Sequence, residues 1–173
     1  MSVPNNQFSD STRSGTKRDT SRIGPALGKI ASGLYVATAR INDAPIGMLC
    51  SFVEQAGFDP PMISVAIGVG RPIEAALQSD SLFGLHILSK ENGALLKSFA
   101  RGGTAESFDR HVLGDNAFHI PQFLEAWAFL LCKVAGRVRA GDHTVYVAEV
   151  LDGVLQHENQ EPMVRVRANG FGY

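Results

Sequence analysis

The stretch from Gly47 to Ile67 constrains the fold of this chain more than any other segment. It holds the rigid corner Asp59-Pro-Pro61 between two apolar runs. Both prolines fix φ near about −65°, and Asp59 is pushed to an extended conformation because a proline follows it. The chain must therefore re-enter a sheet at a defined angle, either as a plain β-hairpin or beside a bound group. Room for a flat group to approach the backbone is left by the small residues Gly47, Cys50, Ser51, Ala56 and Gly57.

The remaining strands are indicated by alternating or β-prone runs. They are predicted at residues 34–41, 62–67, 82–88, 126–139, 143–151 and 163–167. The run over 62–67 is nearly continuous in apolar residues, so we expect it to be buried on both faces. Short helices are predicted over 25–31, 73–78 and 91–99, the last with Ser89 as its N-cap. This pattern favours a mainly β fold, a mostly antiparallel barrel with short helical insertions.

Length and composition indicate one domain. The 173 residues are enough for a sizeable core. Residues 1–22 are polar and are predicted to form a disordered arm before a domain spanning 23–173. We expect the cytoplasm as location, because the two cysteines suit a reducing compartment and the N-terminus lacks the apolar core of a signal peptide.

Several classes of function are disfavoured. A net charge of −1 gives no electrostatic basis for binding nucleic acid, and no apolar run is long enough to span a bilayer. Histidines and cysteines do not lie at metal-ligand spacing, so no metal site is expected. The common nucleophile, phosphate-loop and dinucleotide motifs are absent. An enzymatic function then requires a cofactor that carries the chemistry while the protein binds and orients it.

The chain resembles the flavin reductase-like family, whose members have an FMN-binding split barrel. The likeness extends to the reductase module at the C-terminal part of cyanobacterial diflavin flavoproteins. It is carried, in order, by residues 26–36, 47–52, 59–61, 71–75, 83–89, 99–100 and 141–143 and by Tyr173.

This resemblance implies a fold and an activity. The implied fold is an antiparallel, Greek-key-like split barrel that forms a homodimer with one flavin per subunit. The implied cofactor is FMN, with FAD as the other possibility, and the implied reductant is NADH or NADPH. The activity would be NAD(P)H-dependent flavin reduction, with the electrons passed to a monooxygenase or another acceptor. Two alternatives stay open, namely a flavin- or haem-binding relay or sensor module without turnover, and an interaction subunit without cofactor.

The resemblance also assigns a site. The backbone amides of residues 48–52 and the Ser51 hydroxyl would hold the flavin ring edge and ribityl chain. Arg71 matches a basic position near the flavin phosphate, which a guanidinium binds through charge-assisted hydrogen bonds. His143 is the candidate catalytic residue, because the family places this imidazole close to flavin or nicotinamide. The cofactor-binding candidates are Met48, Leu49, Cys50, Ser51, Phe52, Arg71, Ser89, Lys90 and Tyr173.

Each candidate also has a plainer interpretation. Ser89 is equally explained as a helix N-cap, Arg71 as a solvated loop charge and His143 as a surface histidine. Cys50 is better explained as a packed residue than as a nucleophile, since no histidine is close in sequence to activate it. Many family members carry Ser or Thr at the positions of Met48 and Cys50, so some polar contacts must come from the backbone or be missing. That loss would favour the relay module over the reductase if it weakens the nicotinamide pocket.

Overall fold

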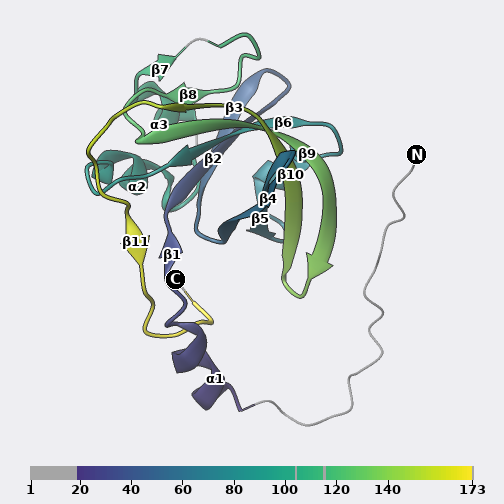
Figure 1. Ribbon diagram of the computed structural model, residues 1–173, viewed down its shortest axis with the longest axis vertical. Helices are drawn as coiled ribbons and strands as arrows, with labels where there is room; N and C mark the ends of the chain where they lie inside the picture. Colours follow the sequence, from purple (N-terminus) through teal and green to yellow (C-terminus); the bar gives the residue numbers. More distant parts are fainter. Residues whose placement is uncertain (1–18, 104, 115, 173) are drawn as a thin grey trace.

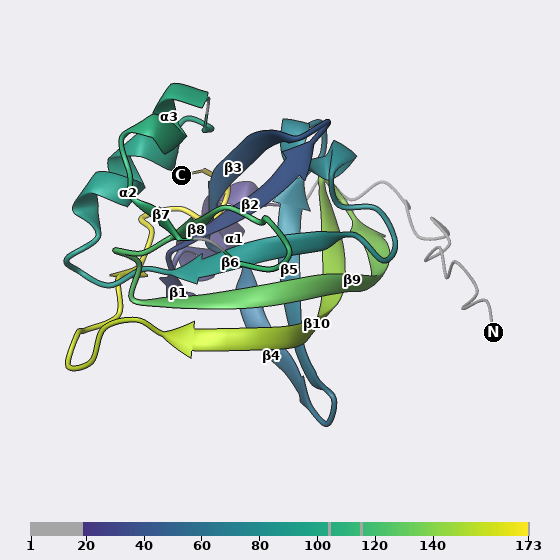
Figure 2. The same ribbon diagram turned by 90° about the horizontal axis from the view of Figure 1, so that it is seen from above.

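A seven-stranded antiparallel sheet organises the computed structural model, which describes residues 19–172 apart from 104 and 115 (Figure 1). In Figure 2 the sheet coils, and β4 and β5 run steeply across β6 and β9. The strands, in order across the sheet, are β3 (Ala44–Cys50), β2 (Tyr35–Ile41), β6 (Leu82–Ile87), β9 (Ala128–Ala140), β10 (His143–Leu155), β5 (Pro61–Gly68) and β4 (Val53–Phe58).

The sheet is open, with β3 and β4 as its two edges. These strands follow each other in the chain and are separated only by Ser51 and Phe52. The chain therefore passes from one edge strand of the sheet to the other in two residues. The two edge strands do not pair with each other. The mainly β, antiparallel prediction is confirmed, whereas the expected barrel is not closed by hydrogen bonds.

The long hairpin of β9 and β10 follows the sequence pattern closely. Gly141 has φ +65° in its turn, and His143 pairs with Ala140 directly after it. Register shifts interrupt the pairing between Val147 and Ala148 and again further along β10. The first lies opposite Gly136, where the alternation is broken in the sequence, and β10 continues to Leu155 beyond its predicted end.

The hairpin of β4 and β5 adds a strand and corrects one expectation. Residues before the proline corner form the strand β4, and the Asp59–Pro60 peptide bond in the turn is cis. In β5, Ile63, Val65 and Ile67 are buried while the alternate residues are half-buried, so burial on both faces was wrong. The apolar run was misleading because small or flexible side chains occupy the half-covered face.

The helices are short and lie outside the sheet. They are α1 (Thr20–Leu27), the 3₁₀ helix η1 (Pro72–Ala75), α2 (Gly93–Phe99) and α3 (Ala105–Asp109). No helix among the described residues has the length and apolar character needed to cross a bilayer.

Two helix starts differ from prediction. Helix α1 begins at Thr20 because the Asp19 carboxylate accepts a hydrogen bond from the Ser21 amide, so residues 20–22 are helical. The rest of the predicted disordered arm, residues 1–18, lies outside the described residues. Helix α2 begins at Gly93 with Asn92 at its N-cap position, so Ser89 does not cap it.

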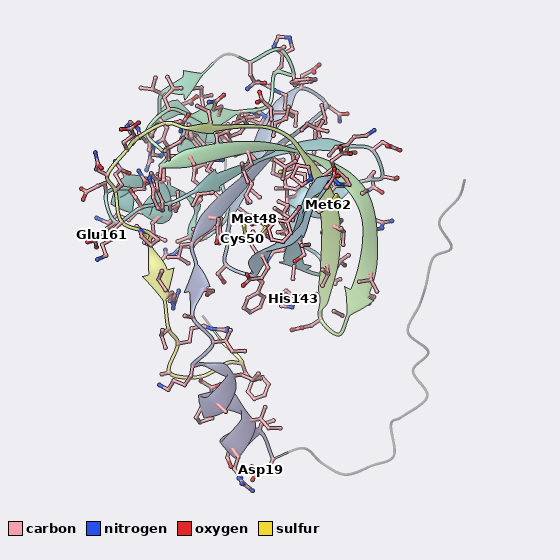
Figure 3. The ribbon with its side chains drawn as sticks, viewed as in Figure 1. Asp19, Met48, Cys50, Met62, His143 and Glu161 are labelled. Atoms are coloured by element: carbon pink, nitrogen blue, oxygen red, sulfur yellow. The ribbon has the colours of Figure 1, made fainter. Side chains whose placement is uncertain are left out.

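Helix α1 and the C-terminal segment form an arm that projects from the sheet, with Asp19 at its far end (Figures 1 and 3). The Arg167 amide donates to Gly28 O and the Gly170 amide to Gly24 O. Two small antiparallel pairs complete the fold, β1 (Ser32–Gly33) with β11 (Val164–Arg165) and β7 (Leu113–Gly114) with β8 (Gln122–Phe123).

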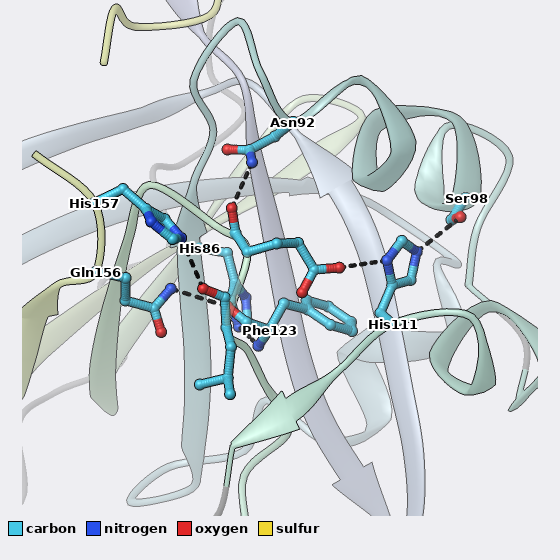
Figure 4. A network of polar contacts seen from close by, with 9 residues as sticks. His86, Asn92, Ser98, His111, Phe123, Gln156 and His157 are labelled. Carbon is cyan, nitrogen blue, oxygen red and sulfur yellow. Dashed lines mark hydrogen bonds and ion pairs between the residues drawn. The ribbon is translucent and has the colours of Figure 1, made fainter. Parts of the chain in front are cut away.

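A histidine network, defined by His86, Ser98, His111 and Glu125, ties the outer helices to the sheet (Figure 4). His111 Nδ1 lies 2.5 Å from Glu125 Oε1, and its Nε2 lies 2.9 Å from Ser98 Oγ. His86 Nδ1 lies 3.0 Å from the carbonyl oxygen of Val36 and its Nε2 accepts from the amide of residue 123, so the Nδ1–H tautomer is fixed. Both rings thus have partners at each nitrogen, in a core that also contains Phe99, Phe108 and Phe123.

Candidate functional site

A cleft of about 1030 Å³ lies along β3, between the loop after β5 and the C-terminal end of α2. Figure 3 shows Met48 and Cys50 of β3 near the open side of the sheet, with His143 at its lower rim. The lining comprises residues 46–50, Ala66, 68–73, Leu96, Lys97, 99–103, Asp142, His143 and Arg165. Five segments that are far apart in sequence therefore meet at one site.

Half of the predicted site residues meet here. Met48, Leu49, Cys50, Arg71 and His143 all line the cleft. Ser51 and Phe52 follow Cys50 directly in the chain but are not lining residues. Ser51 is buried, and the ring of Phe52 lies 5.6 Å from the ring of His143.

Two further candidates, Ser89 and Lys90, lie away from the cleft. Ser89 is fully buried, and its hydroxyl lies 3.1 Å from Asn92 Oδ1. Lys90 extends to the surface and forms an ion pair with Glu161. Neither lines the cleft, because both residues pair with the C-terminal segment at residues 161 and 162 after the end of β6. Tyr173 lies outside the described residues.

The cleft is strongly cationic. Its lining includes the guanidinium or ammonium groups of Arg71, Lys97, Arg101 and Arg165 against the single carboxylate of Asp142. Such a charge balance favours an anionic ligand over a neutral one. A second cavity of about 380 Å³ is lined mainly by apolar side chains, and its one charged residue is Glu54. The first cavity is therefore the site suited to a phosphate-bearing molecule.

The loop that carries Arg71 is held in place by hydrogen bonds from its backbone amides. Gly70 has φ +82°, a conformation that side-chain-bearing residues rarely adopt. The Val69 amide donates to Asp142 O at 2.9 Å, and the Gly70 amide donates to Glu74 Oε2 at 2.6 Å. Arg71 thus extends into solvent from a loop that is fixed on both sides.

His143 is oriented by two neighbours. Its Nδ1 lies 2.8 Å from Asp142 Oδ1, and this hydrogen bond together with the imidazole charge lowers the pKa of Asp142. On another side, Phe52 packs between the His143 ring and the guanidinium of Arg167, which lies 5.0 Å from the Phe52 centroid. Among the described residues, Nε2 has no hydrogen-bond partner. It lies 3.7 Å from the position that a Cβ on Gly68 would occupy.

Cys50 supplies no reactive thiolate. It is 3% exposed, and burial raises the pKa of its thiol to about 12. Its sulfur is therefore protonated at neutral pH, which agrees with its interpretation as a packed residue. Cys132 is likewise free and buried.

Sequence reasoning missed five residues of this region, namely Glu74, Lys97, Arg101, Arg165 and Arg167. Lys97 and Arg101 flank the end of α2, where basic side chains are common for electrostatic reasons alone. Nothing local in the sequence shows that this end faces β3. The isolated bridge between Gly47 and Gly103, together with the packing of Phe99 against Gly47, brings the two together.

Comparison with known proteins places this fold and cleft in a family. The model of the flavin reductase like domain matches residues 27–170, which is most of the chain. The chain therefore belongs to the flavin reductase like domain family, as the sequence resemblance predicted.

Curated relatives are of two kinds. The chain is 35% identical over 142 residues to a putative diflavin flavoprotein of Synechocystis, a match that covers 79% of this chain and 24% of the relative. It spans only about a quarter of the length of the diflavin relatives. It is 30% identical over 153 residues to the reductase component of a 4-nitrophenol 4-monooxygenase/4-nitrocatechol 2-monooxygenase of Rhodococcus opacus, covering 88% of this chain and 82% of that relative.

Solved structures show the same fold. The NADH:FAD oxidoreductase of Streptomyces globisporus, determined in complex with NAD and FAD fragments, superposes with a TM-score of 0.74 at 23% identity. The match covers 85% of this chain and 88% of that one. At this identity the likeness concerns the fold.

Proposed function

We propose that this protein is an NAD(P)H-dependent flavin oxidoreductase that reduces FMN, with FAD as the alternative flavin. The observation that carries the proposal is the cleft, in which the apolar edge strand β3, the cationic Arg71 loop and His143 face one space. Family membership and the reductase relative from Rhodococcus support the same activity.

The lining fits a flavin nucleotide chemically. Met48, Leu49 and Ile73 offer an apolar wall for a flat ring system. Because β3 is an edge strand, one side of its backbone presents N–H and C=O groups that a ring edge can use. The phosphate would be bound by Arg71, whose guanidinium provides paired donors. The cleft is also large enough for a cofactor of this size, by the usual range for such sites.

The bound flavin would supply the ring that accepts hydride from the reduced nicotinamide. The chain's own groups would bind, orient and exclude water. Met48 and Leu49 would keep the reacting faces dry, while the His143 imidazole, held by Asp142 at Nδ1, would present Nε2 to the ligand. Backbone N–H donors along β3 would stabilise the negative charge that develops on the ring on reduction. Orientation of two rings in contact is itself a large part of the rate enhancement in such reactions.

The second candidate is an electron-relay module without turnover. It is favoured by the side chains of β3, because Met48 and Cys50 bring no hydroxyl to the cleft. Fewer polar contacts would weaken a nicotinamide pocket more than a flavin site, since the flavin is also held by backbone and by Arg71.

The proposal includes partners and location. We propose a homodimer, supported by the apolar side chains that the arm exposes, among them Ile30 at 61% and Phe171 at 58%. The electron acceptor would be a monooxygenase, as the relative from Rhodococcus suggests. A cytoplasmic location is proposed because the nicotinamide pool is there and both cysteines are free thiols.

Binding and turnover measured on the purified protein test this proposal. Titration with FMN and with FAD, followed by flavin fluorescence, gives the affinities. NADH and NADPH oxidation with each flavin then gives the turnover, and light scattering gives the oligomeric state. Saturable flavin binding with nicotinamide oxidation supports the reductase. Tight binding without oxidation favours the relay module, and no binding of either flavin contradicts both.

A further inference from the structure

One carboxylate joins the two halves of the cleft. Glu74 lies in η1, three residues after Arg71, and does not itself line the cleft. Its Oε2 accepts the Gly70 amide at 2.6 Å. Its Oε1 accepts the Thr144 hydroxyl at 3.2 Å and the Tyr146 hydroxyl at 3.3 Å. The Arg71 loop is thereby connected to β10, the strand that begins at His143.

The two contacts to β10 are partly buried, whereas the contact to the Gly70 amide is exposed. Tyr146 is 1% exposed, and its pKa is raised by burial and then by the Glu74 charge. Hydrogen bonds to an ionised carboxylate are stronger than neutral ones, and more so away from bulk water. The shortest of the three hydrogen bonds is the one from the Gly70 amide. Gly70 has a left-handed backbone conformation (φ +82°), which directs the following residue, Arg71, into the cleft.

The backbone around Glu74 adds to the connection. The Glu74 amide donates to Arg71 O at 3.0 Å, and the Gln78 side chain donates to Glu74 O at 3.0 Å. Independently, the Val69 amide donates to Asp142 O, next to His143. The side chain of Glu74 is thus the polar link that runs from the arginine loop into the interior of the sheet, while the Val69 contact holds the outer rim.

We propose that Glu74 is a positioning residue, whose carboxylate fixes the Arg71 guanidinium relative to the His143 imidazole. The proposed phosphate-binding group, Arg71, and the proposed catalytic group, His143, are then held at a fixed separation. This inference rests on the proposed flavin reductase function. It adds to that function a residue outside the cleft on which the affinity for the flavin phosphate depends.

Three variants test the role. Glu74→Ala removes both links. Glu74→Gln keeps an acceptor for the Gly70 amide and an amide group that can pair with a hydroxyl. Glu158→Ala is the matched control, because Glu158 is an exposed acid on a distant loop. Loss of charge-assisted hydrogen bonds predicts FMN binding about tenfold or more weaker in Glu74→Ala. We expect Glu74→Gln to recover most of this loss and Glu158→Ala to bind like the wild type.

A double-mutant cycle separates positioning from general stability. If Glu74 acts through Arg71, adding Glu74→Ala to Arg71→Ala changes the FMN affinity by less than about twofold, since the group being positioned is gone. A full additional tenfold loss in the double variant overturns the proposal. So does unchanged FMN affinity in Glu74→Ala when the wild type binds flavin.

Hydrogen exchange on the flavin-free protein gives a readout that is independent of the cofactor. The Gly70 amide should exchange faster in Glu74→Ala than in the wild type, and as slowly as the wild type in Glu158→Ala. Unchanged exchange overturns the inference. Faster exchange together with a wild type that binds no flavin would confirm the link and contradict the proposed function, so the two failures are distinguishable.

Discussion

The histidine network and the cleft use the same kinds of side chain in opposite ways. In the network, both ring nitrogens of His86 and of His111 have protein partners, and the rings pack against buried phenylalanines. In the cleft, His143 has a partner at Nδ1, and Arg71 projects from a loop into solvent.

The difference separates stability from function. A side chain whose donors and acceptors are all used within the protein contributes to folding and has nothing left to offer a ligand. A cationic side chain on a rigid but exposed loop contributes little to folding and much to binding. Substitutions in the network should therefore change the free energy of unfolding, and those in the cleft should change ligand affinity.

The largest expected effect is on stability, at Phe123, which packs against both histidines of the network. Phe123 is fully buried and its ring contacts those of His86, Phe99, Phe108 and His111. Phe123→Ala should lower the free energy of unfolding by about 3–5 kcal/mol, measured in urea. The control is Phe58→Ala, at a hairpin tip where the side chain is 89% exposed, which should change it by less than about 0.5 kcal/mol. Equal losses of unfolding free energy in the two variants would contradict the stabilising role of the network.

Acid should destabilise the network through His86. Burial lowers its pKa to about 4 from the ordinary 6.5. Between these pH values the unfolded chain binds a proton that the folded chain does not. The free energy of unfolding should therefore fall as the pH falls through this window, by about 3 kcal/mol in total. Urea unfolding of the wild type and His86→Gln across the window checks this, and a loss of the same size in both would show that another group is responsible.

In the cleft the expected effect is on affinity. Arg71→Ala should weaken FMN binding by about 10- to 100-fold, because a charge-assisted contact to the phosphate is lost. The free energy of unfolding should stay within about 0.5 kcal/mol of the wild type. Arg110→Ala, which removes an exposed arginine outside the cleft, is the control. An Arg71→Ala variant that binds FMN normally would place the phosphate elsewhere, at Lys97 and Arg101 among the candidates.

A pair of glycines gives the smallest and sharpest contrast. A Cβ on Gly84 would lie 2.6 Å from Phe129 and 2.7 Å from Thr38 Oγ1, so Gly84→Ala should destabilise the fold by about 1–3 kcal/mol. A Cβ on Gly68 would lie 3.7 Å from His143 Nε2 and 3.8 Å from Arg71, an ordinary contact. Gly68→Ala should therefore fold normally but narrow the cleft and weaken FMN binding. Thermal unfolding and FMN titration of both variants provide the test.

The sequence predicts the regular parts of this fold and less of its site. Alternation located β9 and β10, where buried residues mostly alternate with more exposed ones, while β-prone composition located β2 and β6, which are buried on both faces. Alternation missed β4, where residues 54–56 are exposed and Gly57 interrupts the pattern, as expected for an edge strand. Ser89 has the side chain of an N-cap, but the helix starts at Gly93, and the hydroxyl pairs with Asn92 instead.

For the site, local motifs were sufficient only where the chain itself approaches the cleft. Residues 48–50, Arg71 and His143 lie at strand ends or turns, and the family resemblance located them. Lys97, Arg101 and Arg165 enter through long-range packing of α2 and β11, which no spacing in the sequence reveals. The contacts of Glu74 to Thr144 and Tyr146 likewise depend on the fold, because β10 lies about 70 residues further along the chain.

Anaerobic mixing of the flavin-loaded protein with NADH or NADPH, followed by visible absorption, tests the central claim most directly. Bleaching of the flavin band in the wild type, with the amount of bound flavin reduced in Arg71→Ala but not in Arg110→Ala, is the result expected of a reductase with its flavin in this cleft. A flavin band that stays oxidised with both nicotinamides, or one retained equally by Arg71→Ala, would contradict it.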